Sequence, residues 1–103
     1  RDPYAVETAR RLVALFEEDT ARVQSLGRAA GSTLRAFQAL CERPILRLND
    51  ICRRTGMSFP TATKSTDGLT KLGIARELTG QRRNRVFSYD AYLSILNEGG
   101  EPL

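Results

Sequence analysis

Histidine is absent from this sequence, and cysteine is nearly so. Without histidine the chain has no imidazole to serve as a general base or as a metal ligand. Its two cysteines, Cys41 and Cys52, are too few for a disulfide framework and lack the spacing of a metal site. We therefore expect no metal and no cofactor.

Long apolar runs are missing too, and the longest are a few residues, far short of the ~20 that cross a bilayer. Nothing resembles a signal peptide. The sequence also has no Gly-rich phosphate loop, no nucleophile elbow and no carboxylate pair. Glu17, Glu18 and Asp19 are consecutive on a predicted helix, so they point in different directions. We expect a cytoplasmic chain with no membrane partner and no catalytic residue.

What the sequence does contain is an uneven distribution of charge. The 103 residues fit one domain, with a net charge of +4 and a pI of about 9.6. Five acidic side chains lie within residues 1–20, whereas most lysines and arginines lie within residues 43–85. The basic character therefore belongs to the second half. Because the chain begins with Arg1 rather than Met, we expect it to be a piece of a longer protein.

A long helix is predicted from Tyr4 to about Leu26, with Asp2 as its N-cap and Pro3 at its first position. Its apolar residues form one stripe at spacings of seven: Ala5, Ala9, Leu12, Phe16, Val23 and Leu26. The stripe can pack on its own domain, dock on an upstream domain, or pair with a second copy. The sequence leaves these three alternatives open.

A second helix is expected after the small residues Gly27–Gly31, with Ser32 as its cap. Leu34, Phe37, Leu40 and Cys41 share its buried face, which makes Cys41 a core thiol. Pro44 ends this helix. Ile45 and Leu46 then favour a very short strand.

Residues 48–72 read as two short helices joined by a tight turn. The first runs from Leu48 or Asn49 to Thr55, and Gly56 ends it in a left-handed conformation. Ser58 caps the second, whose expected inner face holds Phe59, Ala62, Leu69 and Leu72, with Ser65 or Thr66 between them. The opposite face is expected to present the following residues: Thr61, Lys64, Asp67, Gly68 and Lys71.

A β-hairpin is predicted next, because residues 74–78 and 85–89 alternate between apolar and polar types around the turn Gly80–Asn84. Asp90 caps a last helix. The predicted fold is mainly α with a small β-hairpin wing, a winged helix-turn-helix preceded by a long N-terminal helix. We divide it into that helix (1–28), the winged helix-turn-helix (29–98) and a frayed tail (99–103).

This arrangement predicts contact with duplex DNA. Hydroxyls and ammonium groups on the second short helix can bond bases or phosphates, and arginines on the turn can bond the backbone. Arg53 and Arg54 would add further contacts to the phosphates of the DNA backbone. The candidate residues on the helix are Ser58, Thr61, Thr63, Lys64, Ser65 and Lys71. Those on the wing are Gln81, Arg82, Arg83, Asn84 and Arg85.

The chain also resembles the C-terminal winged-helix region that follows the catalytic domain in many bacterial Fic/DOC-family proteins. The residues that carry the resemblance are Ala5–Thr8, Asp19, Gly27–Ser32, Arg43–Ile45, Gly56–Ala62, Leu72–Ile74, Glu77–Phe87, Tyr89 and Tyr92. The sequence departs from the pattern at Thr66–Gly68, where a helix-favouring segment is expected.

Enzymes of that family transfer AMP from ATP to protein hydroxyls through a His-Pro…Gly-Asn-Gly-Arg motif, which this chain lacks. The resemblance implies an accessory module, acting by DNA binding, target recruitment or autoregulation, with an AMP-transferring domain upstream and in cis. Two alternatives stay open. One is a protein-interaction module, and the other is a free-standing transcriptional regulator that forms a homodimer through Tyr4–Leu26.

Overall fold

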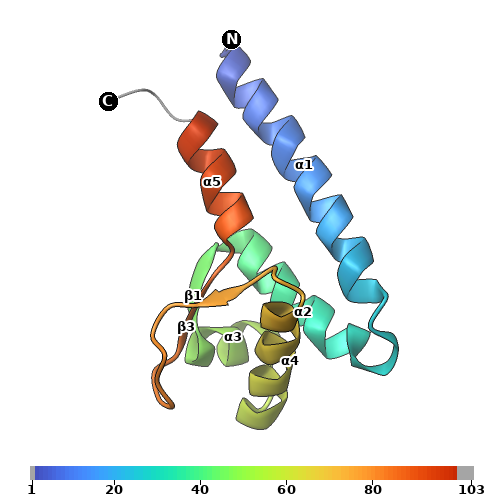
Figure 1. The fold of residues 1–103 in the computed structure, drawn as a ribbon, viewed down its shortest axis with the longest axis vertical. Helices are drawn as coiled ribbons and strands as arrows, with labels where there is room; N and C mark the ends of the chain where they lie inside the picture. The colour runs from blue at the N-terminus through green and yellow to red at the C-terminus, as the bar shows by residue number, and fades with distance from the viewer. Residues whose placement is uncertain (1, 100–103) are drawn as a thin grey trace.

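A computed structural model describes residues 2–99. Six helical segments and three short strands follow one another along the chain. Their order is α1 (Pro3–Gln24), a 3-10 turn η1 (Gly27–Ala29), α2 (Ala30–Glu42), β1 (Ile45–Arg47), α3 (Leu48–Thr55), α4 (Phe59–Lys71), β2 (Arg76–Glu77), β3 (Val86–Ser88) and α5 (Asp90–Gly99). Figure 1 shows α1 and α5 reaching away from the other elements.

The long N-terminal helix begins as the sequence predicts. The Asp2 carboxylate accepts a hydrogen bond from the backbone N–H of Tyr4 at 2.9 Å, and Pro3 is the first helical residue. Of the predicted stripe, only Val23 is fully buried. Farther from the core, Val6 and Val13 remain 44% and 55% exposed, so much of the helix has apolar surface that the domain does not cover.

Helix α2 crosses the middle of the molecule and carries the centre of the core. Ala36, Phe37 and Leu40 have no exposed surface. The predicted cap at Ser32 is wrong, because η1 runs directly into α2 and the helix already begins at Ala30. Ala29 and Ala30 have helical backbone angles, so Ser32 lies inside the helix and not at its end.

The strands form one antiparallel sheet in the order β1-β3-β2. Leu46 of β1 pairs with Phe87 of β3, and Glu77 of β2 pairs with the same Phe87 from the other side. Phe87 is therefore central in the sheet and has no exposed surface. The short strand predicted at Ile45 and Leu46 and the predicted hairpin are both confirmed.

Helices α3 and α4 meet at a tight turn, as predicted. Gly56 has φ 74°, a left-handed conformation that glycine adopts without steric cost. Helix α3 begins at Leu48, the earlier of the two predicted starts. Asp50 accepts from the backbone N–H of Arg47 at 3.4 Å, which satisfies one of the free donors at that end.

The two terminal helices pack together through an aromatic cluster. Phe16 of α1 lies 6.0 Å from Tyr89 and 5.1 Å from Tyr92, centroid to centroid, and Arg11 pairs with Glu98 at 2.9 Å. Asp90 is the first residue of α5 rather than its predicted cap. Its carboxylate instead accepts from Arg76 at 2.5 Å and from Ser88 at 2.6 Å, which ties α5 to the sheet.

Helix α4 buries the predicted face, except at its first turn. Ala62 and Leu69 are buried as expected, but Phe59 is 54% exposed. Met57, from the turn, is buried instead, and its sulfur accepts from the Ser65 hydroxyl at 3.9 Å. Met57 thus covers the inner face of α4 near its start. Gly68, predicted to face outward, is half-buried beside Thr33 of α2.

None of the helices within residues 2–99 is long and apolar enough to cross a membrane. The predicted tail begins at Gly99, the last residue of α5, and residues 100–103 lie outside the described part of the chain.

Candidate nucleic-acid interface

The outer face of α4 carries four of its six candidate residues. Ser58, Thr61, Lys64 and Lys71 are exposed. The Ser58 hydroxyl caps the helix by accepting from the backbone N–H of Thr61 at 3.4 Å, and it donates to the Thr61 hydroxyl at 3.0 Å. The beginning of α4 therefore presents two linked hydroxyls beside free backbone N–H groups, an arrangement suited to a phosphate oxygen.

The other two candidates on α4 are turned away from solvent. Ser65 is only 3% exposed, because it falls on the same helical face as Ala62 and Leu69. Thr63 is half-buried, and its hydroxyl oxygen is buried without a hydrogen-bond partner among the described residues. The sequence allows Ser65 or Thr66 on the inner face and also offers Ser65 as a DNA contact, and the structure buries both residues. We leave Thr63 and Ser65 out of the interface.

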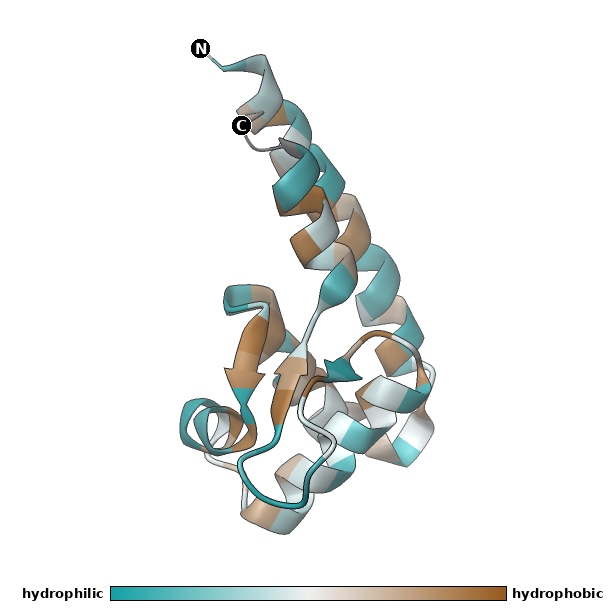
Figure 2. Cartoon of the chain, turned by 60° about the vertical axis from the view of Figure 1, so that its left-hand side comes forward, coloured by the Kyte–Doolittle hydropathy of each residue, from teal (hydrophilic) through white to brown (hydrophobic). Residues whose placement is uncertain are grey.

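We call β2, β3 and the loop between them the wing. The polar side chains at the tip of this wing are exposed. Gln81, Arg82, Arg83 and Asn84 are all at the surface. The Gln81 amide donates to the backbone carbonyl of Asn84 at 3.3 Å, and Asn84 takes a left-handed conformation with φ 54° that closes the loop. Figure 2 shows this loop as a continuous hydrophilic segment.

Arg85 differs from its neighbours because its side chain points inward. It is 19% exposed and donates to Asp67 of α4 at 3.2 Å and to Glu77 of β2 at 3.1 Å. Its guanidinium carbon also lies 5.0 Å from the centre of the Phe87 ring. The Arg85 guanidinium, together with the Thr79 hydroxyl, holds the pKa of the Glu77 carboxyl below its ordinary value. Arg85 therefore does not present its charge to a ligand as the sequence analysis expected.

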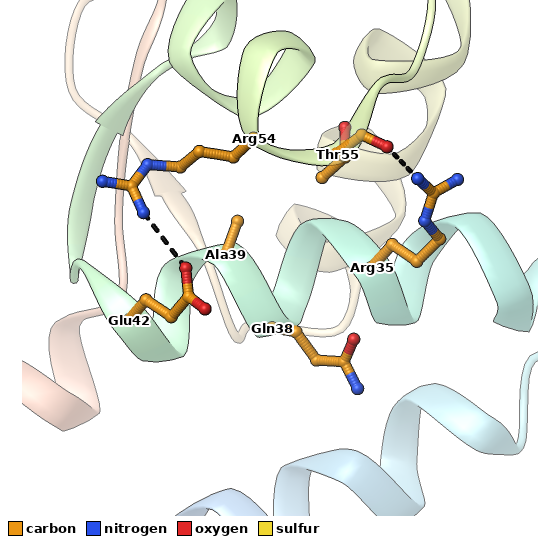
Figure 3. A pocket seen from close by; sticks show the side chains of 6 residues that line it. All are labelled: Arg35, Gln38, Ala39, Glu42, Arg54 and Thr55. Atoms are coloured by element: carbon orange, nitrogen blue, oxygen red, sulfur yellow. Dashed lines mark hydrogen bonds and ion pairs between the residues drawn. The ribbon is translucent and has the colours of Figure 1, made fainter.

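The arginines of α3 are also engaged. Arg53 pairs with Asp50, and Arg54 pairs with Glu42 of α2 at 3.0 Å. A small cleft of about 160 Å³ lies between α2 and α3. Figure 3 shows Arg54 reaching Glu42 and Arg35 donating to the carbonyl of Thr55 at this cleft. The Arg54 and Arg35 contacts join α2 to α3, whereas the Arg53–Asp50 pair lies within α3. Because Arg53 and Arg54 each already have a carboxylate partner, they have less charge to offer the predicted phosphate contacts.

Part of the remaining positive charge lies on α4 and the wing loop. Lys64, Lys71, Arg82 and Arg83 are exposed, and none of them forms an ion pair with another residue of the 2–99 range. Figures 1 and 2 place the wing loop and the start of α4 at the same end, away from the outer ends of α1 and α5. A helix end and a hairpin tip that project side by side match the two contacts of a protein that reads a groove and its flanking backbone.

Two solved structures have the same arrangement of elements. The structure of RV1404 from Mycobacterium tuberculosis superposes with a TM-score of 0.55 at 16% identity, covering 92% of this chain and 68% of that one. The present chain therefore has a winged-helix fold. The structure of NadR in complex with 4-hydroxyphenylacetate gives a TM-score of 0.52 at 16% identity, covering 93% of this chain and 67% of NadR. No protein-family model and no curated protein matches the chain.

Metal-ligating and thiol groups contrast with the surface cations in the part that the structure describes. There, no three side chains of the His, Cys, Asp or Glu types come together to hold a metal ion. Cys41 is half-buried, and burial, with Asp19 and Glu42 nearby, raises the pKa of its thiol to about 12. A thiol with so high a pKa stays protonated at neutral pH and is a poor nucleophile. The exposed lysine and arginine side chains of α4 and the wing loop can bind a polyanion.

Proposed function

We propose that this chain is a DNA-binding regulatory module in which the start of α4 enters the major groove and the wing contacts the backbone. The observation that carries the proposal is the exposure of Lys64, Arg82 and Arg83 without acidic partners at one end of the fold. Support also comes from the winged-helix fold that this chain shares with the structures of RV1404 and NadR.

Phosphate contacts dominate the proposed mode of binding. Each lysine or arginine that neutralises a phosphate releases condensed counterions, which makes the affinity fall as salt rises. The Ser58 and Thr61 hydroxyls and the helix N-terminus add hydrogen bonds to the same phosphates or to base edges. The proposed interface consists of Ser58, Thr61, Lys64, Lys71, Gln81, Arg82, Arg83 and Asn84.

Phe59 adds an apolar group to this surface that the sequence analysis placed in the core. Its side chain is 54% exposed at the first turn of α4, directly after the capping residue Ser58. An apolar side chain in the major groove contacts the methyl group of thymine, which is the one apolar feature of a base edge there. Some sequence preference is therefore expected at that position.

The test is a salt titration of binding to a mixed-sequence duplex, with the double variant Arg82→Ala/Arg83→Ala. The native chain is expected to bind at low salt, and the variant to lose affinity with a salt slope smaller by about 2, because each phosphate contact contributes about 0.9. Arg10→Ala/Arg28→Ala removes the same charge from exposed arginines outside the proposed interface and serves as the matched control. Equal losses in the two double variants, or no binding at low salt, would reject the proposal.

We further propose that the module is the accessory domain of a Fic-family AMP-transferring protein, with α1 joining it to the catalytic domain and no catalytic residue in this chain. Support comes from the resemblance carried by residues 77–87 and from the uncovered apolar surface of α1, where Val13, Phe16 and Thr20 line a shallow hollow. The coding sequence immediately upstream is the test. A His-Pro…Gly-Asn-Gly-Arg motif there is expected, and its absence would reject this assignment.

A protein-interaction module is the alternative favoured by a specific observation, the exposed Phe59 ring. In that case a protein partner covers the same surface in place of DNA. Phe59→Ala would then release the protein partner. Neither Phe59→Ala nor Arg82→Ala/Arg83→Ala would change the affinity for DNA. The salt titration described above separates the two functions.

A further inference from the structure

We infer that Arg85 is a positioning residue that fixes the direction of the wing relative to α4. This inference rests on the proposed function, because it assigns to Arg85 the task of aligning two DNA-contacting elements. The sequence places Arg85 beside Arg82 and Arg83 as a third basic residue of the wing. The structure instead places its side chain between two carboxylates.

The contacts of Arg85 join three elements at one point. Its guanidinium bonds Asp67 on α4 and Glu77 on β2, and its own backbone carbonyl accepts from the N–H of Leu48, the first residue of α3, at 2.9 Å. Phe87, fully buried in the middle strand, lies beneath the guanidinium. A planar guanidinium with several donors in fixed directions suits such a junction, which a lysine would fill less well.

Glu77 extends the junction into the loop. One of its carboxylate oxygens accepts from Arg85, and the other accepts from the Thr79 hydroxyl at 2.8 Å and from the backbone N–H of Gln81 at 3.3 Å. Thr79 in turn accepts from the backbone N–H of Val86 at 3.4 Å. The first part of the loop is thus bound to the base of the wing, and the arginine tip extends from a fixed support.

The bond between Arg85 and Asp67 has no substitute in the described residues. It is the one side-chain hydrogen bond there that connects α4 with the wing residues 76–88. Asp67 is half exposed and Glu77 is not, so the two partners have separate roles. Glu77 keeps Arg85 within the hairpin, and Asp67 ties the hairpin to α4.

Asp67→Asn therefore gives a test whose sign distinguishes positioning from simple electrostatics. Removing a negative charge from a DNA-binding surface raises the affinity if charge alone matters. If Asp67 aligns the wing, the same change lowers the affinity, by about two- to fivefold, in line with the modest free energy of a partly exposed ion pair. Glu42→Gln, which releases Arg54 in the same way but touches no wing residue, is the matched control and is expected to bind DNA at least as well as the native chain.

A second readout needs no DNA. The ¹⁵N relaxation of the Arg82 and Arg83 backbone amides reports the mobility of the wing tip on the picosecond to nanosecond timescale. We expect this mobility to rise in Asp67→Asn, to rise further in Arg85→Ala, and to return to the native level in Asp67→Glu, while the α4 amides stay unchanged.

Lower affinity together with a more mobile tip in Asp67→Asn supports the inference. Higher affinity, or an unchanged tip, overturns it. If the native chain binds no duplex at low salt, the proposed function fails, and the relaxation data still decide by themselves whether Asp67 and Arg85 hold the wing.

Discussion

The hydroxyl of Tyr89 donates a hydrogen bond of 2.6 Å to the carboxylate of Asp19, a residue 70 positions earlier in the chain. Both side chains are buried, and the second oxygen of Asp19 accepts from Arg22 at 2.9 Å. This pair fixes α1 to the point where the sheet passes into α5. A buried carboxylate is tolerated here because both of its oxygens have donors.

Tyr89→Phe is expected to destabilise the fold by about 1–3 kcal/mol, because it leaves one oxygen of a buried carboxylate without a donor. Urea unfolding measures the loss. Tyr92→Phe is the control, since Tyr92 belongs to the same aromatic cluster but makes no side-chain hydrogen bond among the described residues. The free energy of unfolding of Tyr92→Phe should stay within about 0.5 kcal/mol of the native value. Equal effects in the two variants would mean that the hydroxyl contributes nothing specific.

Alkaline pH should weaken the same region. Burial raises the pKa of the Cys41 thiol from its ordinary value of 9.0 to about 12, and burial with the Asp19 hydrogen bond raises the pKa of Tyr89 above its ordinary 10.0. A group whose pKa is raised in the folded state stabilises the fold fully below its unfolded pKa, and the contribution is lost as the pH rises. The free energy of unfolding, measured under reducing conditions, should therefore fall between about pH 9 and 12. Cys41→Ala should make the fall less steep, and an identical slope would contradict the assignment.

Gly68→Ala is expected to stabilise the chain by about 0.5–1 kcal/mol, because alanine has the higher helix propensity. The added Cβ would lie 3.6 Å from the Thr33 hydroxyl and 3.7 Å from its methyl group, which are ordinary contacts. Gly56→Ala makes the same chemical change where φ is 74°, and it should cost about 1–2 kcal/mol. Thermal unfolding of the two variants and the native chain measures both changes in stability. Destabilisation by Gly68→Ala would show that α2 and α4 cannot accommodate a methyl group.

Phe59→Ala should abolish a preference for thymine over uracil. A duplex selected from a randomised pool is compared with the same duplex containing deoxyuridine in place of thymidine. The native chain should bind the thymine form about fourfold more tightly, the equivalent of roughly 0.8 kcal/mol for one methyl group. Tyr4→Ala, which removes another exposed aromatic ring at the opposite end, should retain the difference. A native chain that binds both forms equally would remove Phe59 from base recognition.

If α1 serves to join a catalytic domain in cis, the isolated chain should sediment as a monomer at micromolar concentration. A concentration-dependent dimer would instead favour a free-standing regulator that pairs through residues 4–26. Val13→Glu would then dissociate it, because Val13 is 55% exposed on the uncovered face. Ala14→Glu introduces the same charge on a different side of the helix and should leave a dimer intact.

The sequence by itself determined the order and type of the elements. Asp2 with Pro3, Gly56, Ser58 with Pro60, and Gly73 are local signals whose backbone preferences act within a few residues, so the ends of α1, α3 and α4 follow from them. The exposed part of the wing, including Arg82 and Arg83, followed from the turn chemistry of residues 80–84 in the same way. These predictions need no knowledge of distant residues.

Only the tertiary structure decided which side chains are available to a ligand. Met57 covers the inner face of α4 and leaves Phe59 in solvent, and α2 approaches Gly68 closely. Asp67 and Glu77, 18 and 8 positions before Arg85, draw its side chain inward. The pairing of Tyr89 with Asp19 likewise joins α1 to the residue that precedes α5. Each of these outcomes depends on contacts between segments far apart in sequence, and a local pattern of residue types does not encode which partner a charged or aromatic side chain will meet.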